Sequence, residues 1–265
     1  MRELERESPS DIPACTRLAI IGRGRVGSAI AHALRGATQS AFSVHGPLAR
    51  GQAPGDADAL LLCVPDDEIA GVAAAIATGP PILGHCSGAT GLDILAPHEA
   101  FGLHPLMTVT GPGTRFAGAA AAVAGSTPRA LATAQALADA LGLIALPLAD
   151  SDRPAYHAAA SIASNFLVTL EGMAERMAAT AGVSREQLVP LVRATVENWA
   201  SLGARAALTG PVARGDEDTV ARQRDAVQQR APEMLETFDA LVTATRALAA
   251  APPAVGSAVP SNGGA

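Results

Sequence analysis

Three glycines near the start of the chain restrict the fold more than any other feature of the sequence. They follow an apolar run at residues 18–21 and lead into an alanine-rich segment at residues 27–35. Gly22, Gly24 and Gly27 have the spacing G-x-G-x-x-G. Without side chains, these positions allow a tight turn, the approach of a diphosphate to the backbone, and close packing of a helix against a strand. The spacing therefore predicts a strand, a turn and a helix that together bind a dinucleotide.

Apolar and alanine-rich segments continue to alternate up to about residue 150, whereas only helical periodicity follows Asp152. Strands that alternate with helices predict a mostly parallel sheet covered on both faces. The predicted fold class is α/β, with an N-terminal Rossmann dinucleotide-binding domain followed by an all-helical C-terminal domain. Strands are predicted at residues 18–21, 41–45, 59–64, 81–85, 100–104, 119–124 and 143–148, and helices at residues 27–35, 67–77 and 128–141.

The C-terminal helices have recognisable start and stop signals. Ser184 and Gln187 have the spacing of a capping box, Gly210 and Pro211 are expected to end the helix that follows, and Pro232 is expected to divide the last helical region. Helices are predicted at residues 153–181, 184–209 and 218–249. We expect a polar tail at 1–15, the Rossmann domain at 16–150, the helical domain at 151–249 and a disordered tail at 250–265.

Charge and composition exclude several classes of partner. The formal net charge of −6 comes without a basic stripe, so a nucleic-acid partner is not expected. No apolar run is long enough to span a membrane, and the start of the chain lacks a secretory signal. Three cysteines without metal-ligand spacing predict a reduced, cytoplasmic protein and no metal site. All 19 cationic residues are Arg, so no reaction step can use a lysine ammonium group.

The choice between the two nicotinamide cofactors depends on the end of the second strand. An NAD-binding domain carries Asp or Glu there, but no acidic residue occurs between Gly27 and Asp56. Arg23 in the glycine loop and Arg50 after the second strand are suited to a 2′-phosphate, which guanidinium groups bind through paired hydrogen bonds. We therefore predict NADP as the cofactor, with Arg50 as a simple solvated loop residue being the alternative.

Further candidate residues follow the third, fourth and fifth predicted strands, whose carboxyl ends border ligands in open α/β folds. Pro65 is expected to shape the wall near the nicotinamide ribose, Asp66 or Asp67 to cap the next helix, and Cys86 to fill space. His104 is interpreted either as a substrate ligand or as a residue that completes a turn. The predicted cofactor-binding residues are Gly22, Arg23, Gly24, Arg25, Val26, Gly27, Arg50, Val64, Pro65 and Ser87.

Polar residues spaced by four follow one face of the first C-terminal helix. They are His157, Ser161, Asn165 and Thr169. Ser161 and Asn165 lie among apolar residues, so we expect them to line a cleft, whereas a solvated face is the alternative and fits Thr169. Farther along, Gly210 opens a tight turn in which Arg214 is suited to a substrate carboxylate. The alternative for Arg214 is a local ion pair with Asp216. The predicted catalytic residues are His157, Ser161, Asn165 and His104, and the predicted substrate-binding residues are Arg214, Gly210 and Ser87.

Residues 17 to 248 resemble the family that joins a Rossmann-like domain to a domain of unknown function. The resemblance rests on the glycine motif, Val64-Pro65-Asp66, His85-Cys86-Ser87-Gly88, His104-Pro105, Ser164-Asn165 and Gly210-Pro211-x-x-Arg214-Gly215-Asp216. That family is related to pyrroline-5-carboxylate reductase, ketopantoate reductase and the 3-hydroxyisobutyrate and 6-phosphogluconate dehydrogenases. The resemblance implies a homodimer joined through the helical domains. It also implies a lysine four residues before Asn165, where this chain has Ser161.

These features lead to a hypothesis of NADP-dependent reduction of a small carboxylate-bearing substrate, such as the 2-oxo acid ketopantoate. The nicotinamide would lie near Ser87, and His157 or His104 would supply a proton directly or through water. One alternative is an imine reductase of the pyrroline-5-carboxylate reductase type. A second alternative is a non-catalytic NADP-binding sensor or scaffold. A methyltransferase that binds S-adenosylmethionine is less compatible with the basic loop after the second strand.

Overall fold

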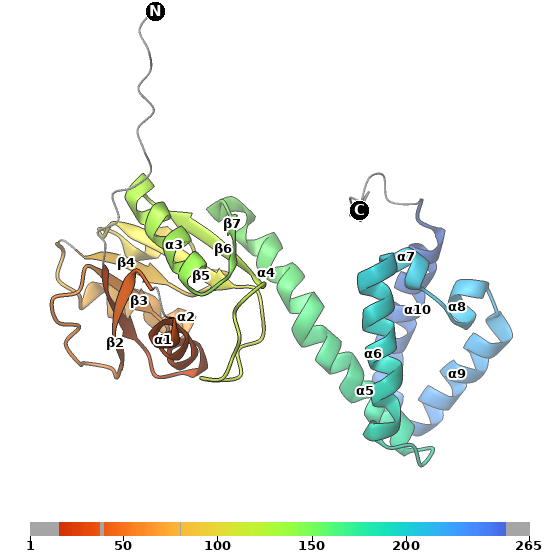
Figure 1. The fold of residues 1–265 in the computed structure, drawn as a ribbon. Helices are drawn as coiled ribbons and strands as arrows, with labels where there is room; N and C mark the ends of the chain where they lie inside the picture. Colours follow the sequence, from red (N-terminus) through yellow and green to blue (C-terminus); the bar gives the residue numbers. More distant parts are fainter. Residues whose placement is uncertain (1–15, 38–39, 80, 253–265) are drawn as a thin grey trace, which may run out of the picture. The chain divides into compact units, whose positions relative to one another are not determined.

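The computed structural model describes residues 16–37, 40–79 and 81–252. Cys15 and the predicted polar tail at 1–15 lie outside the described residues, and so does the predicted tail at 250–265 from residue 253 onward. The chain divides into two compact units, Met1–Asn165 and Phe166–Ala265. The first unit contains the sheet and the second contains helices (Figure 1). The sequence-based division at residues 150 and 151 marks the end of the sheet, whereas the compact units divide 15 residues later, within a helical segment. Among the described residues, no helix is both long and apolar enough to cross a membrane.

All seven predicted strands are present in one mostly parallel sheet, which confirms the predicted α/β class. The spatial order is β2-β1-β3-β4-β5-β6-β7, and only β5 and β6 pair antiparallel. Because β1 lies between β2 and β3, the chain reverses its direction of winding there, and this reversal is where open α/β sheets bind ligands. The strands are β1 (Thr16–Ile21), β2 (Phe42–Leu48), β3 (Ala59–Leu62), β4 (Ile82–His85), β5 (Ala100–Pro105), β6 (Ala120–Gly125) and β7 (Ile144–Pro147).

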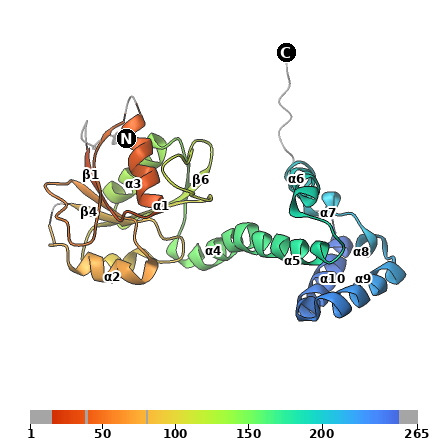
Figure 2. The same ribbon diagram turned by 90° about the horizontal axis from the view of Figure 1, so that it is seen from below.

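The sheet is covered on both faces, as its continuous apolar strands require. On one face, Leu18 and Ile20 of β1 pack in the core beneath α1 (Arg25–Gly36) and α3 (Pro128–Ala140). On the other face, Ala19 and Ile21 pack in the core beneath α2 (Asp66–Ala74) and the short 3-10 helix η1 (Leu92–Leu95). Figure 2 shows α1 and α3 on the side of the sheet opposite α2. Alternate residues of β1 therefore enter different cores, because successive strand side chains point to opposite faces.

β2 extends beyond its predicted end at residue 45. It continues through Gly46 and Pro47 to Leu48, with a register shift opposite Ala19 and Ile21 of β1. The shift accommodates Gly46, whose φ of 100° is favourable only for glycine. Because the strand runs on, Arg50 lies just past its carboxyl end rather than in a distant loop.

The helical segment predicted at 153–181 contains α4 (Arg153–Ser161), a π-helical turn η3 (Ile162–Phe166) and α5 (Leu167–Ala179), and a short 3-10 helix η2 (Asp150–Asp152) precedes it. The predicted capping box of Ser184 and Gln187 is confirmed at the start of the next helix. The predicted end of that helix at residue 209 is wrong, because Gly203, with φ of 78°, ends it at Leu202. The remaining helices are α6 (Arg185–Leu202), α7 (Ala204–Ala207), α8 (Pro211–Arg214), α9 (Glu217–Arg230), η4 (Pro232–Met234) and α10 (Leu235–Ala250).

Pro232 divides the last helical region as predicted, since η4 separates α9 from α10. The second unit has its own small core around Val227, Met234 and Phe238. Met173 and Met177 of α5 pack against this core. Several large apolar side chains on α5 and α6 remain exposed, including Trp199 at 58 %. The second unit therefore buries only part of its apolar surface against itself.

Candidate functional site

Two of the three glycines in the turn after β1 are required by backbone packing. Gly22 has a φ of 116°, and a Cβ atom there would lie 2.2 Å from the Cys63 carbonyl oxygen. A Cβ atom at Gly27 would lie 2.1 Å from the Gly22 carbonyl oxygen. These glycines let α1 pack directly on the ends of β1 and β3, as the motif predicts.

Gly24 has a different role, because a Cβ atom there would have nothing within 4 Å. It is the N-cap residue of α1, no side chain caps the helix, and the first turn has no acidic residue. The first N–H groups of α1 have no partner within the helix, and they carry the positive end of its dipole. The open space beside Gly24 therefore fits a diphosphate, whose oxygens these N–H groups would bind.

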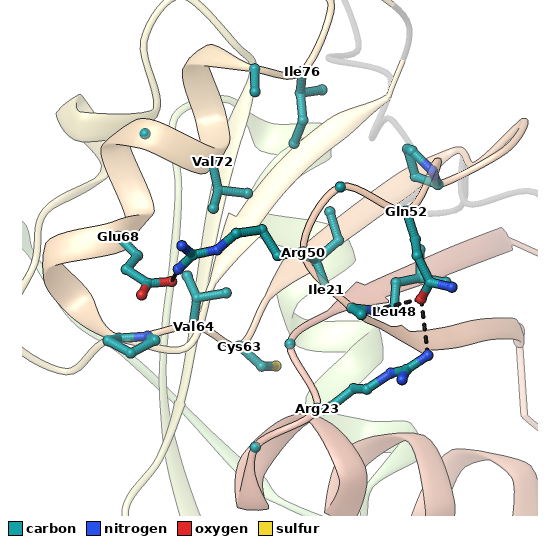
Figure 3. Close-up of a pocket in the computed structure, with 18 of the residues that line it drawn as sticks. Ile21, Arg23, Leu48, Arg50, Gln52, Cys63, Val64, Glu68, Val72 and Ile76 are labelled. Carbon is teal, nitrogen blue, oxygen red and sulfur yellow. Dashed lines mark hydrogen bonds and ion pairs between the residues drawn. The ribbon is translucent and has the colours of Figure 1, made fainter.

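A cavity of about 900 Å³ opens beside this turn, at the reversal point between β1 and β3. Its walls are the glycine turn, the loop from Leu48 to Pro54 after β2, the end of β3, and one face of α2. Val64 and Pro65 line it, as expected for the loop after the third strand. Figure 3 shows the side chains that surround the cavity. Its position and size suit the adenosine part of a dinucleotide.

Arg23 and Arg50 both line this cavity, as the sequence predicts (Figure 3). The Arg23 Nη2 atom donates a hydrogen bond to Gln52 Oε1 at 3.0 Å. Arg50 forms an ion pair with Glu68 of α2, and this hydrogen bond and charge raise the pKa of the Arg50 guanidinium. The Arg50 side chain is nevertheless 76 % exposed, so it remains available to a ligand.

Among the described residues, Glu68 of α2 is the only carboxylate that lines the cavity. The end of β2 contributes none, so no acidic group stands where an NAD-binding domain would bind the ribose hydroxyls. The cavity therefore carries two guanidinium groups and lacks the β2 carboxylate that would repel a 2′-phosphate.

Ser87, expected near the nicotinamide, is 7 % exposed and is fully engaged in hydrogen bonds. Its Oγ atom donates to Asp66 Oδ2 at 2.7 Å and accepts from the N–H groups of Ala89 and Thr90 at 3.2 and 3.0 Å. The expectation that Asp66 or Asp67 caps α2 is wrong, because Pro65 occupies the cap position and no side chain caps the helix. Asp66 instead ties the start of α2 to the loop after β4.

His85 is fully buried and holds the same loop in place. Its Nδ1 atom accepts from the Ser87 N–H at 3.2 Å, and its Nε2 atom lies 3.2 Å from the Gly91 carbonyl oxygen. Burial lowers the pKa of His85, so the ring is neutral and its Nε2–H donates to Gly91. Cys86 follows it with its Sγ atom 3.6 Å from that of Cys63, and both thiols are free. These residues shape the loop.

His104 lies at the carboxyl end of β5, next to two aromatic rings from α4. Its Nδ1 atom is 2.8 Å from the Tyr156 hydroxyl, and its ring centroid is 6.2 Å from that of His157. Burial, followed by the nearby His157 and Arg153, lowers the pKa of His104 to about 4. The structure thus brings together two of the predicted catalytic residues, and His104 is neutral at physiological pH.

Arg153 anchors the start of α4 beneath this group. It is 2 % exposed, its Nε atom donates to Asp150 Oδ1 at 2.5 Å, and its Nη1 atom donates to the Ser87 carbonyl oxygen at 3.4 Å. Burial would raise the pKa of Asp150, but the Arg153 guanidinium and the Leu92 N–H outweigh it and lower the pKa. Through these contacts, α4 is attached to the loop after β4, which positions Tyr156 and His157.

The other predicted residues occupy less enclosed positions. Ser161 is half-buried at the end of α4, and Asn165 is exposed in the π-helical turn. Gly210, with φ of 99°, is the N-cap of α8 in the second unit, and Arg214 is exposed at the end of that helix. Asp216 caps α9 by accepting a hydrogen bond from the Thr219 N–H at 3.1 Å.

Tyr156, Arg153 and Asp150 belong to the candidate site but were missed by the sequence reasoning. Tyr156 directly precedes His157, the first residue of the polar stripe. No local pattern distinguishes it, since its partner His104 lies 52 residues away in the chain. The burial of Arg153 also has no sequence signal, because Arg is usually exposed.

Comparisons with known protein families and structures agree with this architecture. Residues 47–109 match a Rossmann-like domain, and residues 119–245 match a domain of unknown function, DUF2520. The chain thus carries the two domains that its motifs indicated. A comparison with curated proteins finds no match.

Solved structures with the same fold cover nearly all of the described chain. Protein TM1727 from Thermotoga maritima is 22 % identical with a TM-score of 0.75, and the match covers 88 % of this chain and 100 % of that one. A Bacteroides fragilis protein provisionally named an NADP oxidoreductase is 17 % identical with a TM-score of 0.73, covering 88 % and 99 %. Plasmodium falciparum pyrroline carboxylate reductase with NADP bound is 14 % identical with a TM-score of 0.56, covering 88 % and 98 %. At these identities the similarity establishes the fold.

Proposed function

We propose that this protein binds NADP across the carboxyl ends of β1, β3, β4 and β5 and uses it to reduce a small carboxylate-bearing carbonyl compound. The observation that carries the proposal is the cavity beside the glycine turn, where Arg23 and Arg50 lie and β2 contributes no carboxylate. The α1 N-terminus beside Gly24 would bind the diphosphate, and the two guanidinium groups would bind the 2′-phosphate. The NADP-related names of two proteins with this fold support the choice of cofactor.

The proposed reaction site lies beyond the cavity, along the same edge of the sheet. When bound, the reduced nicotinamide supplies a hydride. The nicotinamide would lie near the β4 end, beside the loop around Ser87 and Gly88, in which Gly88 packs against the His104 ring. His104 and His157 stand at the next strand end, where a reduced carbonyl oxygen would need a hydrogen-bond donor.

His104 acts in this proposal as a neutral hydrogen-bond donor. With a pKa of about 4, its imidazole is uncharged at neutral pH. Ser161 and Asn165 are the proposed polar contacts that replace the missing family lysine. Arg214, whose guanidinium is exposed in the second unit, is the proposed partner of the substrate carboxylate, and Gly210 shapes its turn.

The proposed substrate is a 2-oxo acid of ketopantoate type, by the family resemblance of the motifs. The second candidate is a cyclic imine, and the shared fold of the pyrroline carboxylate reductase favours it. A protonated imine already carries the charge that a carbonyl lacks, so it would need less help from His104. A non-catalytic NADP sensor would bind the cofactor and reduce neither substrate.

The proposed assembly is a homodimer formed through the helical unit, in a reducing compartment such as the cytoplasm. The exposed apolar side chains of α5 and α6 support the dimer, because a second copy would cover surface that is costly to leave in water. The free thiols of Cys63 and Cys86 are compatible with a reducing compartment.

Two measurements on the purified protein test this proposal. Calorimetry with NADPH, NADH and S-adenosylmethionine should show tight binding of NADPH alone, and absence of heat with both nicotinamide cofactors would refute the proposal. NADPH oxidation is then followed against a panel of 2-oxo acids and cyclic imines. Turnover identifies the substrate class, whereas binding without any turnover supports the sensor. Asn165→Ala should lower turnover and leave NADPH binding unchanged if Asn165 contacts the substrate.

A further inference from the structure

The imidazole of His104 is held from two sides. Its Nδ1 atom lies 2.8 Å from Tyr156 Oη, and the two ring planes meet at 84° with centroids 5.5 Å apart. On the other side lies Gly88, where a Cβ atom would be only 2.8 Å from Cε1 and 2.9 Å from Nε2 of the ring. The absent side chain at Gly88 and the hydroxyl of Tyr156 together determine how this ring is oriented.

The Tyr156 hydroxyl is itself well positioned. It is carried by the first turn of α4, which the buried Arg153 attaches to Asp150 and to the Ser87 carbonyl oxygen. Because Arg153 is almost completely buried, the start of α4 cannot shift without exposing or unpairing its charge. The contact between Tyr156 and His104 is therefore supported by buried interactions.

The charged and titratable groups around the pair keep both members in their neutral forms. Burial, His157, Arg153 and His85 lower the pKa of His104, and Asp66 opposes them weakly, with a net pKa of about 4. Burial raises the pKa of the Tyr156 phenol, against a smaller lowering from the Ala122 backbone N–H. At neutral pH the pair thus holds one phenolic proton and one imidazole proton.

The geometry selects one arrangement of these two protons. If the phenol donates to His104 Nδ1, its proton has an acceptor at 2.8 Å, and the ring proton is on Nε2. In the opposite arrangement the phenolic proton would be left with the His104 carbonyl oxygen at 3.5 Å, a poor acceptor distance. Within the described part of the chain, Nδ1 is the only nitrogen of this ring with a hydrogen-bond partner, so Nε2–H is available to a ligand.

We propose that Tyr156 is a positioning residue that holds His104 as its Nε2–H tautomer, and that the Tyr156–His104 pair passes a proton to the substrate oxygen. This inference rests on the proposed reductase function. As hydride reaches the carbonyl carbon, the carbonyl π bond breaks, the Nε2–H bond breaks and an O–H bond forms on the substrate. The phenolic proton moves to Nδ1 at the same time, leaving an Nδ1–H imidazole and a phenolate. The Nδ1 proton then returns to the phenolate as water delivers a proton to Nε2, which restores the phenol and the Nε2–H tautomer.

The need for the pair follows from the chemistry of a neutral imidazole. His104 alone would have to become an imidazolate to release its proton, which is far too basic an anion for a protein site. A proton received at Nδ1 avoids the imidazolate and leaves a phenolate instead. Burial disfavours that phenolate and raises the pKa of Tyr156, and the Ala122 N–H and the nearby Arg153 charge offset part of this effect. The ring of His104 is half-buried, and its Nε2 atom is where water would deliver the proton that completes the cycle.

Nitrogen-15 NMR of the imidazoles in the full-length, 15N-labelled protein tests the proposal without a substrate. In the wild type, His104 should be a single Nε2–H tautomer from pH 6 to 8. In Tyr156→Phe, which keeps the ring and loses the hydroxyl, both tautomers should be populated. His157→Gln is the control and should leave the wild-type tautomer in place. A wild-type Nδ1–H tautomer overturns the proposal, even if Tyr156→Phe fails to fold.

The kinetic test uses whichever panel substrate is reduced. Tyr156→Phe should lower kcat roughly a hundredfold, the usual size of a general acid contribution, with little change in KM for NADPH. It should also change the pH dependence of kcat, which a purely structural loss would not do. Wild-type kcat and pH dependence in this variant would refute the proton transfer. If NADPH does not bind to the wild type, the proposed function fails, whereas binding with the wrong tautomer refutes only this inference.

Discussion

The glycine turn allows stability and cofactor binding to be perturbed separately, through Gly27 and Gly24. Alanine at Gly27 would place its Cβ atom 2.1 Å from the Gly22 carbonyl oxygen and 3.1 Å from Cys63 Cβ. The Gly22 carbonyl oxygen belongs to the backbone, so a side-chain movement cannot relieve this contact and α1 must move away from β1. Alanine at Gly24 would meet nothing within 4 Å, so its methyl group would project into the open space where we propose that the diphosphate binds.

The expected loss of stability in Gly27→Ala is the difference of two terms. Overpacking costs about 1–3 kcal/mol and more where backbone must move, whereas replacing a helical glycine by alanine gains at most about 1 kcal/mol. We expect a net loss of about 2 kcal/mol, which lowers the melting temperature by about 4–8 °C for a domain of this size. Gly24→Ala should cost less than about 1 kcal/mol, the difference between glycine and alanine at an N-cap.

Differential scanning calorimetry and titration calorimetry together measure both effects. Gly24→Ala should weaken NADPH binding by at least about tenfold, since a methyl group would displace a phosphate from the helix N–H groups. Gly36→Ala, at the other end of α1 with nothing within 4 Å of its Cβ position, is the matched control; it should leave NADPH binding unchanged and raise stability by at most about 1 kcal/mol. If Gly27→Ala melts at the wild-type temperature, the packing argument is refuted. If Gly24→Ala binds NADPH with wild-type affinity, the diphosphate does not bind at this turn.

Three further predictions concern the cofactor phosphate, acid stability and assembly. Arg50→Ala should weaken the binding of NADPH about tenfold and leave the binding of NADH nearly unchanged. Glu68→Gln should change the ratio of the NADPH and NADH dissociation constants in the opposite direction. If neither variant changes this ratio, Arg50 is not the phosphate ligand. His104 has a pKa of about 4 when folded and about 6.5 when unfolded, so the unfolded state gains a proton first and stability falls between pH 6.5 and 4, by at most about 3 kcal/mol. Urea unfolding at pH 7 and 4.5 should show a smaller decrease in the free energy of unfolding for His104→Gln than for the wild type. An equal decrease in the variant and the wild type would contradict the lowered pKa of His104. Light scattering should show a dimer for the wild type and a monomer for Trp199→Glu. A monomeric wild type would refute the proposed dimer.

The sequence by itself determined the order and type of the elements. The seven apolar runs became seven strands of one sheet. The runs of Leu, Ile and Ala in β3 and β4 are fully buried, as strands covered on both faces require. The capping box at Ser184 and the break at Pro232 were also predictable, since each depends on atoms three or four residues apart. The positions of the helix ends were less predictable, as the stop at Gly203 shows, because several glycines compete to end the same helix.

The tertiary structure decided which side chains meet at the site. Ser87 binds Asp66 across 21 residues, His104 meets Tyr156 across 52, and Arg153 reaches the Ser87 carbonyl across 66. No local pattern contains such pairs, because they arise only when parallel strands bring their carboxyl ends to one edge of the sheet. The glycine turn was readable from the sequence because backbone sterics act between neighbouring residues. The protonation state of His104 was not, because it depends on burial and on charges that folding brings together.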